Sequence, residues 1–141
     1  MTLDPTPLNL PFRLLRTAQA MRTAVSRRLE QAFGGDFSAD YWFVLETLLR
    51  CGDMCQADLA RELNRDGASI MRTVNSMERM GLLTVVRDSR RNIVKPTSMA
   101  IDFMPKAQKA VEQAISEPVG NLKTFEINEL SRILDSIFNL Y

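Results

Sequence analysis

The sequence predicts a mostly helical protein with one small β-hairpin, and three observations lead to this fold class. Apolar residues recur at steps of three or four over most of the 141 residues, as they do along one face of a helix. Two β-prone runs, residues 84–87 and 92–95, flank a polar turn and predict the hairpin. The composition, 45% hydrophobic and 25% charged, is typical of a globular chain that buries a core.

Four helices are expected before the hairpin. Ser38 is placed to cap the second of them, and Asp66 to cap the fourth. Gly81 is expected to end the fourth helix, because glycine accepts the left-handed backbone that follows many helices. The expected helices cover residues 12–33, 38–51, 56–64 and about 67–80. Because the last two are short and joined by a tight turn, they are typical of a helix-turn-helix, and the hairpin after them would be its wing.

Two more helices are expected after the hairpin. One covers residues 98–116, and Pro118-Val119-Gly120 is expected to break the chain before a last helix at about 126–140. These helices and the first one carry apolar faces that the winged module leaves without a partner. We therefore expect a helical dimerisation region, residues 1–35 and 98–141, and a winged helix-turn-helix DNA-binding module, residues 36–97.

The composition also excludes several functions. The chain has no histidine, so serine- or cysteine-histidine catalysis and histidine-based zinc sites are not available. Cys51 and Cys55 could supply at most half of a four-thiolate site. No nucleophile–base pair, phosphate loop or metal cluster can be assembled, so we expect no enzyme, no metal and no cofactor. The sequence shows neither a long apolar run nor a secretion signal, which predicts a cytoplasmic protein without a membrane partner.

The net charge of +1 conceals a strong local pattern. Residues 61–95 carry seven arginines and one lysine against four acids, and residues 1–30 carry five arginines against two acids. The net charge is therefore +4 in the first of these segments and +3 in the second, while the rest of the chain is acidic. A basic surface of this kind suits phosphate, although solvated charged faces are also common.

The expected fourth helix is the natural DNA reader, because the second helix of such a motif enters the major groove. After its apolar positions are set aside, the polar residues available for DNA are Ser69, Arg72, Thr73, Asn75 and Ser76. Arginine suits guanine edges, and the smaller polar side chains suit mixed base and phosphate contacts. Taken singly, each is an ordinary exposed helix position. Together, before a basic hairpin, they favour DNA.

The segment QADLARELNRDGASIMRTVNSMERMGLL followed by DSRRNIVKPT resembles the MarR-type transcriptional regulators. Asp88, Arg90, Val94 and Thr97 match the wing signature of that family. The resemblance implies that Arg90, with Arg91 beside it, reaches the DNA minor groove, and that the protein is a homodimer. Pro96 stands where the family usually has leucine, and the hairpin is about three residues shorter than usual.

The resemblance also implies an effector, a small aromatic or anionic molecule bound between the dimerisation helices and the DNA-binding lobe. The side chains that could line its pocket are Arg16, Tyr41, Trp42 and Phe43, although aromatic residues more often fill a core. Some relatives sense oxidants through a cysteine near the start of the first helix. This chain has none there, and Cys51 and Cys55 are better interpreted as small buried or capping residues.

The sequence therefore predicts a sequence-specific regulator of transcription, a repressor that binds a pseudo-palindromic operator in double-stranded DNA as a homodimer and is released by an effector. The alternative is a helical interaction protein, an adaptor that keeps the winged fold without reading DNA. The short wing and the low net charge support that alternative.

Overall fold

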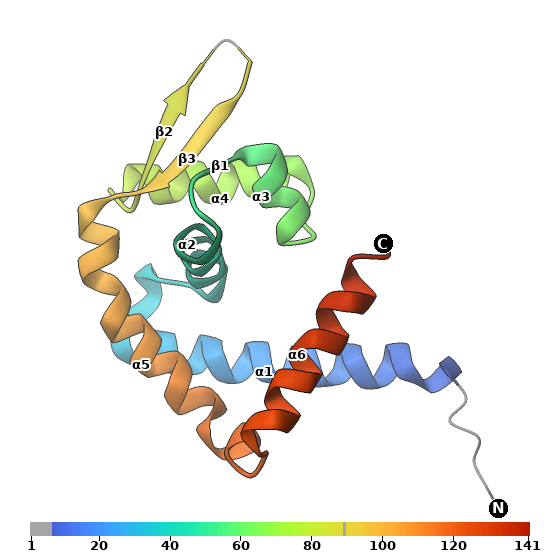
Figure 1. Cartoon of the computed structure of the whole chain (residues 1–141). Coiled ribbons are helices and arrows are strands. Elements are labelled where there is room, and N and C mark those ends of the chain that lie inside the picture. Colours follow the sequence, from blue (N-terminus) through green and yellow to red (C-terminus); the bar gives the residue numbers. More distant parts are fainter. Residues whose placement is uncertain (1–6, 89) are drawn as a thin grey trace, which may run out of the picture.

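The computed structural model describes residues 7–88 and 90–141. The first six residues of the expected dimerisation region, and Ser89 of the expected hairpin turn, lie outside the described residues. The predicted class, mostly helical with a small β wing, is confirmed (Figure 1). In chain order the elements are η1 (Pro7–Asn9), α1 (Leu10–Phe33), η2 (Gly34–Asp36), α2 (Ala39–Cys51), β1 (Met54–Cys55), α3 (Gln56–Glu62), α4 (Gly67–Arg79), β2 (Leu83–Arg87), β3 (Asn92–Pro96), α5 (Ser98–Gly120) and α6 (Thr124–Phe138).

The core lies where α2, α3, α4 and the sheet meet, and it continues between α1 and α5. Its largest fully buried side chains include Leu29, Leu45, Leu59, Ile70 and Met77. An aromatic cluster of Phe33, Phe37 and Phe103 closes the junction of α1 with α5, with the rings of Phe33 and Phe103 stacked at 4.2 Å. The helix-turn-helix is thereby packed onto the frame that α1 and α5 form.

The predicted caps of the helix-turn-helix are confirmed. The side chain of Asp66 accepts a hydrogen bond of 2.7 Å from the backbone N–H of Ser69, which caps α4. Gly81 has φ of 81°, and the N–H of Leu82 donates to the carbonyl of Met77 at 2.9 Å. This is the left-handed ending that a glycine after a helix provides. Both ends of α4 are therefore fixed by local contacts.

The hairpin belongs to a three-stranded antiparallel sheet in the order β1-β3-β2. Val94 of β3 pairs with Val85 of β2 on one side and with Met54 of β1 on the other. The two-residue strand β1 was not expected, because two residues give no measurable periodicity. In Figure 1 the wing (yellow) projects beyond α3 and α4, away from α1.

The expected helix end at residue 116 is wrong, because α5 runs through Pro118 and ends at Gly120, the last residue of the expected break. Pro118 removes one N–H donor, but the packed face of the helix continues past it. Ala110 and Ala114 are buried, and Val119 is still half-buried. The chain turns after Gly120, and α6 follows (Figure 1).

Candidate functional site

Helix α4 has one face in the core and one face in solvent. Ile70, Val74 and Met77 are 1%, 0% and 0% exposed and hold the helix on the core, as predicted. The opposite face presents Met71, Arg72 and Arg79, all of which are exposed. Arg72 and Arg79 are two helical turns apart and lie on one stripe along the side of α4 that faces away from the protein, and Met71 lies beside this stripe.

The structure places the predicted DNA-contacting residues of α4 in different environments. Arg72 is exposed, Asn75 and Ser76 are half-buried at the edges of the stripe, and half-buried Thr73 lines a hollow between α1, α2 and the α3–α4 turn. Arg79, which the sequence analysis did not select, is exposed one turn beyond Asn75 and donates a hydrogen bond to the Ser76 hydroxyl. Its position could have been found from the helical spacing of 72, 75 and 79.

Ser69 does not lie on the exposed face that the sequence analysis expected. It is 8% exposed, and its hydroxyl accepts a short hydrogen bond from the guanidinium of Arg65. Its position at N3 of α4 turns the side chain toward the α3–α4 turn and away from solvent.

The wing arginines lie next to the start of α3. Arg90 and Arg91 are exposed and line a surface hollow whose other wall includes Cys55, Gln56 and Ala57. Within the described part of the chain neither Arg72 nor Arg90 forms an ion pair with a carboxylate. Both charges are therefore available to an anionic partner.

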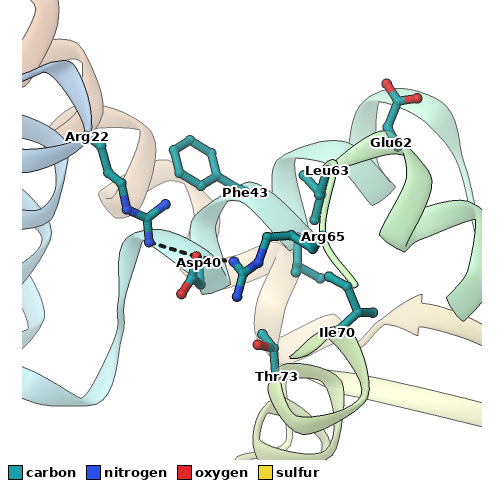
Figure 2. A pocket seen from close by; sticks show the side chains of 9 residues that line it. Arg22, Asp40, Phe43, Glu62, Leu63, Arg65, Ile70 and Thr73 are labelled. Carbon is teal, nitrogen blue, oxygen red and sulfur yellow. Dashed lines mark hydrogen bonds and ion pairs between the residues drawn. The ribbon is translucent and has the colours of Figure 1, made fainter. Parts of the chain in front are cut away.

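A second hollow lies between α1, α2 and the α3–α4 turn, with a cavity of about 300 Å³ (Figure 2). Its apolar wall comes from Phe43, Leu63 and Ile70. Asp40, one turn before Phe43 on α2, lies between two arginines at the same hollow. Its Oδ1 accepts 2.8 Å and 2.9 Å hydrogen bonds from Arg22 and Arg65, respectively.

The two arginines determine the ionisation of Asp40. Partial burial by itself would raise the pKa of Asp40, but the hydrogen bond and the charge of Arg22, together with those of Arg65, outweigh it. The pKa therefore lies below its ordinary value, and the carboxylate stays charged at neutral pH. No local pattern could have revealed this cluster, because its members lie 18 and 25 residues apart in the sequence.

Of the four residues expected to line an effector pocket, Phe43 lies at this hollow. Trp42 is 8% exposed and belongs to the core, which agrees with the more common role of an aromatic residue. Tyr41 packs edge-on against Phe37 at 6.0 Å, and Arg16 is exposed on α1, above the ring of Phe12 at 4.9 Å. The structure therefore does not place Arg16, Tyr41 or Trp42 at the hollow next to Asp40.

Cys51 is exposed and Cys55 is buried, and both are free thiols. Residues 7–88 and 90–141 contain no group of three or more cysteine, aspartate or glutamate side chains arranged to hold a metal ion. In the same part of the chain no helix has the length and apolar character needed to cross a membrane.

Residues 44–84 match the winged helix-turn-helix DNA-binding family, a stretch that runs from α2 to the start of β2. Three solved structures show how far the likeness extends. A MarR-family transcriptional regulator from Rhodococcus sp. RHA1 is 19% identical with a TM-score of 0.82, and the match covers 94% of each chain. NadR in complex with 4-hydroxyphenylacetate is 18% identical with a TM-score of 0.84 over 100% of both chains. CouR from Rhodococcus jostii RHA1, bound to p-coumaroyl-CoA, is 19% identical with a TM-score of 0.80 over 92% of each.

The protein thus carries a winged helix-turn-helix. Over nearly its whole length it has the fold of the MarR-type transcriptional regulators, and the resemblance inferred from the sequence is confirmed in that fold.

Proposed function

We propose that the protein is a sequence-specific DNA-binding regulator that reads the major groove with α4 and the adjacent minor groove or backbone with the wing. The observation that carries this proposal is the exposed stripe of α4, where Arg72 lies free of any carboxylate in the described chain, together with exposed Arg90 and Arg91 on the wing. Arg72 and Asn75 suit base edges, and the wing arginines suit phosphates or a narrow minor groove.

We further propose that the protein acts as a homodimer. Within the described chain, α6 buries none of its residues. Its apolar residues Phe125, Leu130 and Leu134 are 67%, 48% and 41% exposed, and Leu15 on α1 is 60% exposed. A second copy of the chain would cover the exposed apolar residues of α1 and α6. A twofold dimer buries the same face on each of its two chains. Residues 1–35 and 98–141 would form this dimerisation region, and residues 36–97 the DNA-binding module.

A twofold dimer presents two copies of α4 and therefore calls for a pseudo-palindromic operator. Two half-sites would lie about one helical turn of DNA apart, or a multiple of it. Occupancy of such a site within a promoter excludes polymerase, so we propose repression as the mode of regulation.

The effector in this proposal is a small aromatic or anionic molecule bound in the hollow next to Asp40. Two relatives of the same fold are bound to molecules with aromatic rings, 4-hydroxyphenylacetate in NadR and p-coumaroyl-CoA in CouR. In this chain Phe43, Leu63 and Ile70 offer an apolar wall for a ring, and Arg22 and Arg65 offer cations for an acid group.

A binding titration tests the function. The full chain is titrated against a labelled duplex from upstream of its own coding sequence, with a shuffled duplex of equal length and composition as the control. The proposal predicts tighter binding to the upstream duplex, and binding that weakens steeply with salt. Equal, weak binding to both duplexes at low salt would favour the adaptor function instead.

A further inference from the structure

Four polar side chains form one continuous chain of contacts from α1 to α4. Arg22 on α1 and Arg65 in the α3–α4 turn both donate to Asp40 on α2, at 2.8 Å and 2.9 Å. The same Arg65 guanidinium donates to the hydroxyl of Ser69 on α4. Figure 2 shows Asp40 between the two arginines, with dashed lines to each. The helix expected to dimerise is thus joined to the helix expected to read DNA.

The backbone holds Arg65 in the turn between α3 and α4, from which its side chain makes these contacts. Asn64 adopts the left-handed conformation with φ of 49°, and the N–H of Arg65 then donates to the carbonyl of Ala60 at 2.8 Å. Asparagine tolerates this conformation better than most residues. The end of α3 therefore holds the Arg65 backbone, while Asp40 and Ser69 hold its side chain.

Ser69 is likewise held on two sides. Its N–H donates to Asp66, which caps α4, and its buried hydroxyl accepts from Arg65. If the Arg65 guanidinium moved away, the Ser69 hydroxyl would lose this hydrogen bond. The loss would be costly, because Ser69 is only 8% exposed and has little water to replace the bond. The first turn of α4 is therefore held in its position by Arg65, and Arg65 in turn by Asp40.

We propose that the Arg22–Asp40–Arg65–Ser69 network positions the recognition helix α4 relative to α1, so that Asp40, Arg65 and Ser69 determine DNA affinity without contacting DNA. This inference rests on the proposed function, since it describes how the proposed DNA-binding helix is held. Asp40, Arg65 and Ser69 are therefore positioning residues, and Arg72 remains a contact residue.

The network also gives the proposed effector a path to α4. Arg22, Asp40 and Arg65 line the same hollow as Phe43 and Leu63. An acid group that pairs with the two guanidinium groups there competes with Asp40 for them. Because Arg65 is shared between Asp40 and Ser69, this competition loosens the first turn of α4, and the ligand-free geometry is the one that favours DNA.

The test is a double-mutant cycle on the full-length protein, with DNA affinity measured at several salt concentrations. Asp40→Asn and Ser69→Ala are made singly and together, with Asp102→Asn, an exposed acid on α5, as the matched control. We expect each single substitution to lower DNA affinity about tenfold. The double variant should have the same DNA affinity as the single variant that binds DNA more weakly. The slope of log affinity against log salt should stay at the wild-type value, because no phosphate contact is lost.

Arg65→Lys tests whether Arg65 positions α4 or contacts DNA itself. It is a conservative substitution, so the variant is expected to fold. Lysine keeps the charge for a phosphate, but it lacks the planar fork with which arginine binds Asp40 and Ser69 together. We expect Arg65→Lys to lose as much affinity as Asp40→Asn, with circular dichroism and the salt slope unchanged.

Wild-type affinity in Arg65→Lys, or additive effects of Asp40→Asn and Ser69→Ala, would overturn the inference. If these results occur while the wild-type protein binds its duplex specifically, only the positioning role fails. If the wild-type protein binds no DNA specifically, the proposed function fails and the inference fails with it.

Discussion

Arg87, the last residue of β2, makes a two-point ion pair with Glu78 on α4. Its Nη1 donates to Oε2 at 3.1 Å and its Nη2 donates to Oε1 at 3.0 Å. The hydrogen bond from Arg87 lowers the pKa of Glu78, so the pair is charged at neutral pH. The wing is thereby tied to the recognition helix, and the two surfaces proposed to contact DNA are held in one relative orientation.

Glu78→Gln should release the wing without unfolding the protein. The pair is exposed, so its loss should change the free energy of unfolding little. Hydrogen–deuterium exchange should nevertheless become faster in β2 and β3, because one tether to α4 is gone. Unchanged exchange in both strands would show that their pairing alone fixes the wing.

Arg72→Ala should weaken binding to the specific duplex by about 1–3 kcal/mol, because Arg72 is an exposed arginine on the α4 stripe. The matched control is Lys109→Ala on α5, which removes the same charge from an exposed position outside the helix-turn-helix. Fluorescence anisotropy with specific and shuffled duplexes measures both variants. An equal loss in Lys109→Ala would mean that net charge, and not Arg72 itself, drives binding.

Thr97→Ala should destabilise the protein by about 1–2 kcal/mol. The Thr97 hydroxyl donates to the carbonyl of Gly81 at 2.6 Å and accepts from the N–H of Ala100 at 3.2 Å, where it caps α5. Urea unfolding measures the loss. Thr97→Ser keeps the hydroxyl and should retain most of the stability, and a serine variant as unstable as the alanine one would assign the effect to the lost methyl group.

Asp40 should make stability depend on pH in the acid range. Its pKa is lower in the folded chain than its ordinary value of 3.8, so its contribution is complete above that value. The contribution is lost as the pH falls through the lowered pKa, because protonation breaks the pairs with Arg22 and Arg65. Urea unfolding from neutral pH to about pH 3 should therefore show the gap between wild type and Asp40→Asn closing as the pH falls. A gap that stays constant would contradict this assignment.

Leu130→Asp should dissociate the proposed dimer, because it places a charge on the apolar face of α6. Light scattering after size-exclusion chromatography should give twice the 16.0 kDa chain mass for wild type and the chain mass itself for the variant. Asn128→Asp, which adds a charge to the opposite side of α6, should remain dimeric. A monomeric wild-type protein would contradict the proposed assembly.

The local features of the helix-turn-helix were predictable from sequence. Asp66 and Gly81 act on atoms within a few residues of themselves, so a short stretch of sequence contains the whole signal for both ends of α4. The same holds for Ile70, Val74 and Met77, whose spacing marks the buried face.

The misplaced residues depend on contacts between distant segments. Ser69 has the spacing of an edge residue on a DNA-reading helix, but it is buried because Arg65 reaches over it and is itself held by Asp40, 25 residues away. Pro118 has the local signature of a helix end, yet the packed face of α5 continues past it. For the effector pocket, the family resemblance suggested nearby aromatic residues, but the sequence could not distinguish Trp42 in the core from Phe43 at the hollow.

Selection of bound duplexes from a random pool tests whether the protein reads DNA sequence through α4. The wild-type protein should enrich a motif of two inverted half-sites whose centres lie about 10–10.5 base pairs apart, or a multiple of that spacing. Arg72→Ala, selected in parallel, should lose or change preference at a defined position within each half-site. A wild-type pool that remains random after selection would rule out sequence-specific DNA binding, because α4 would then present its exposed stripe to something other than DNA.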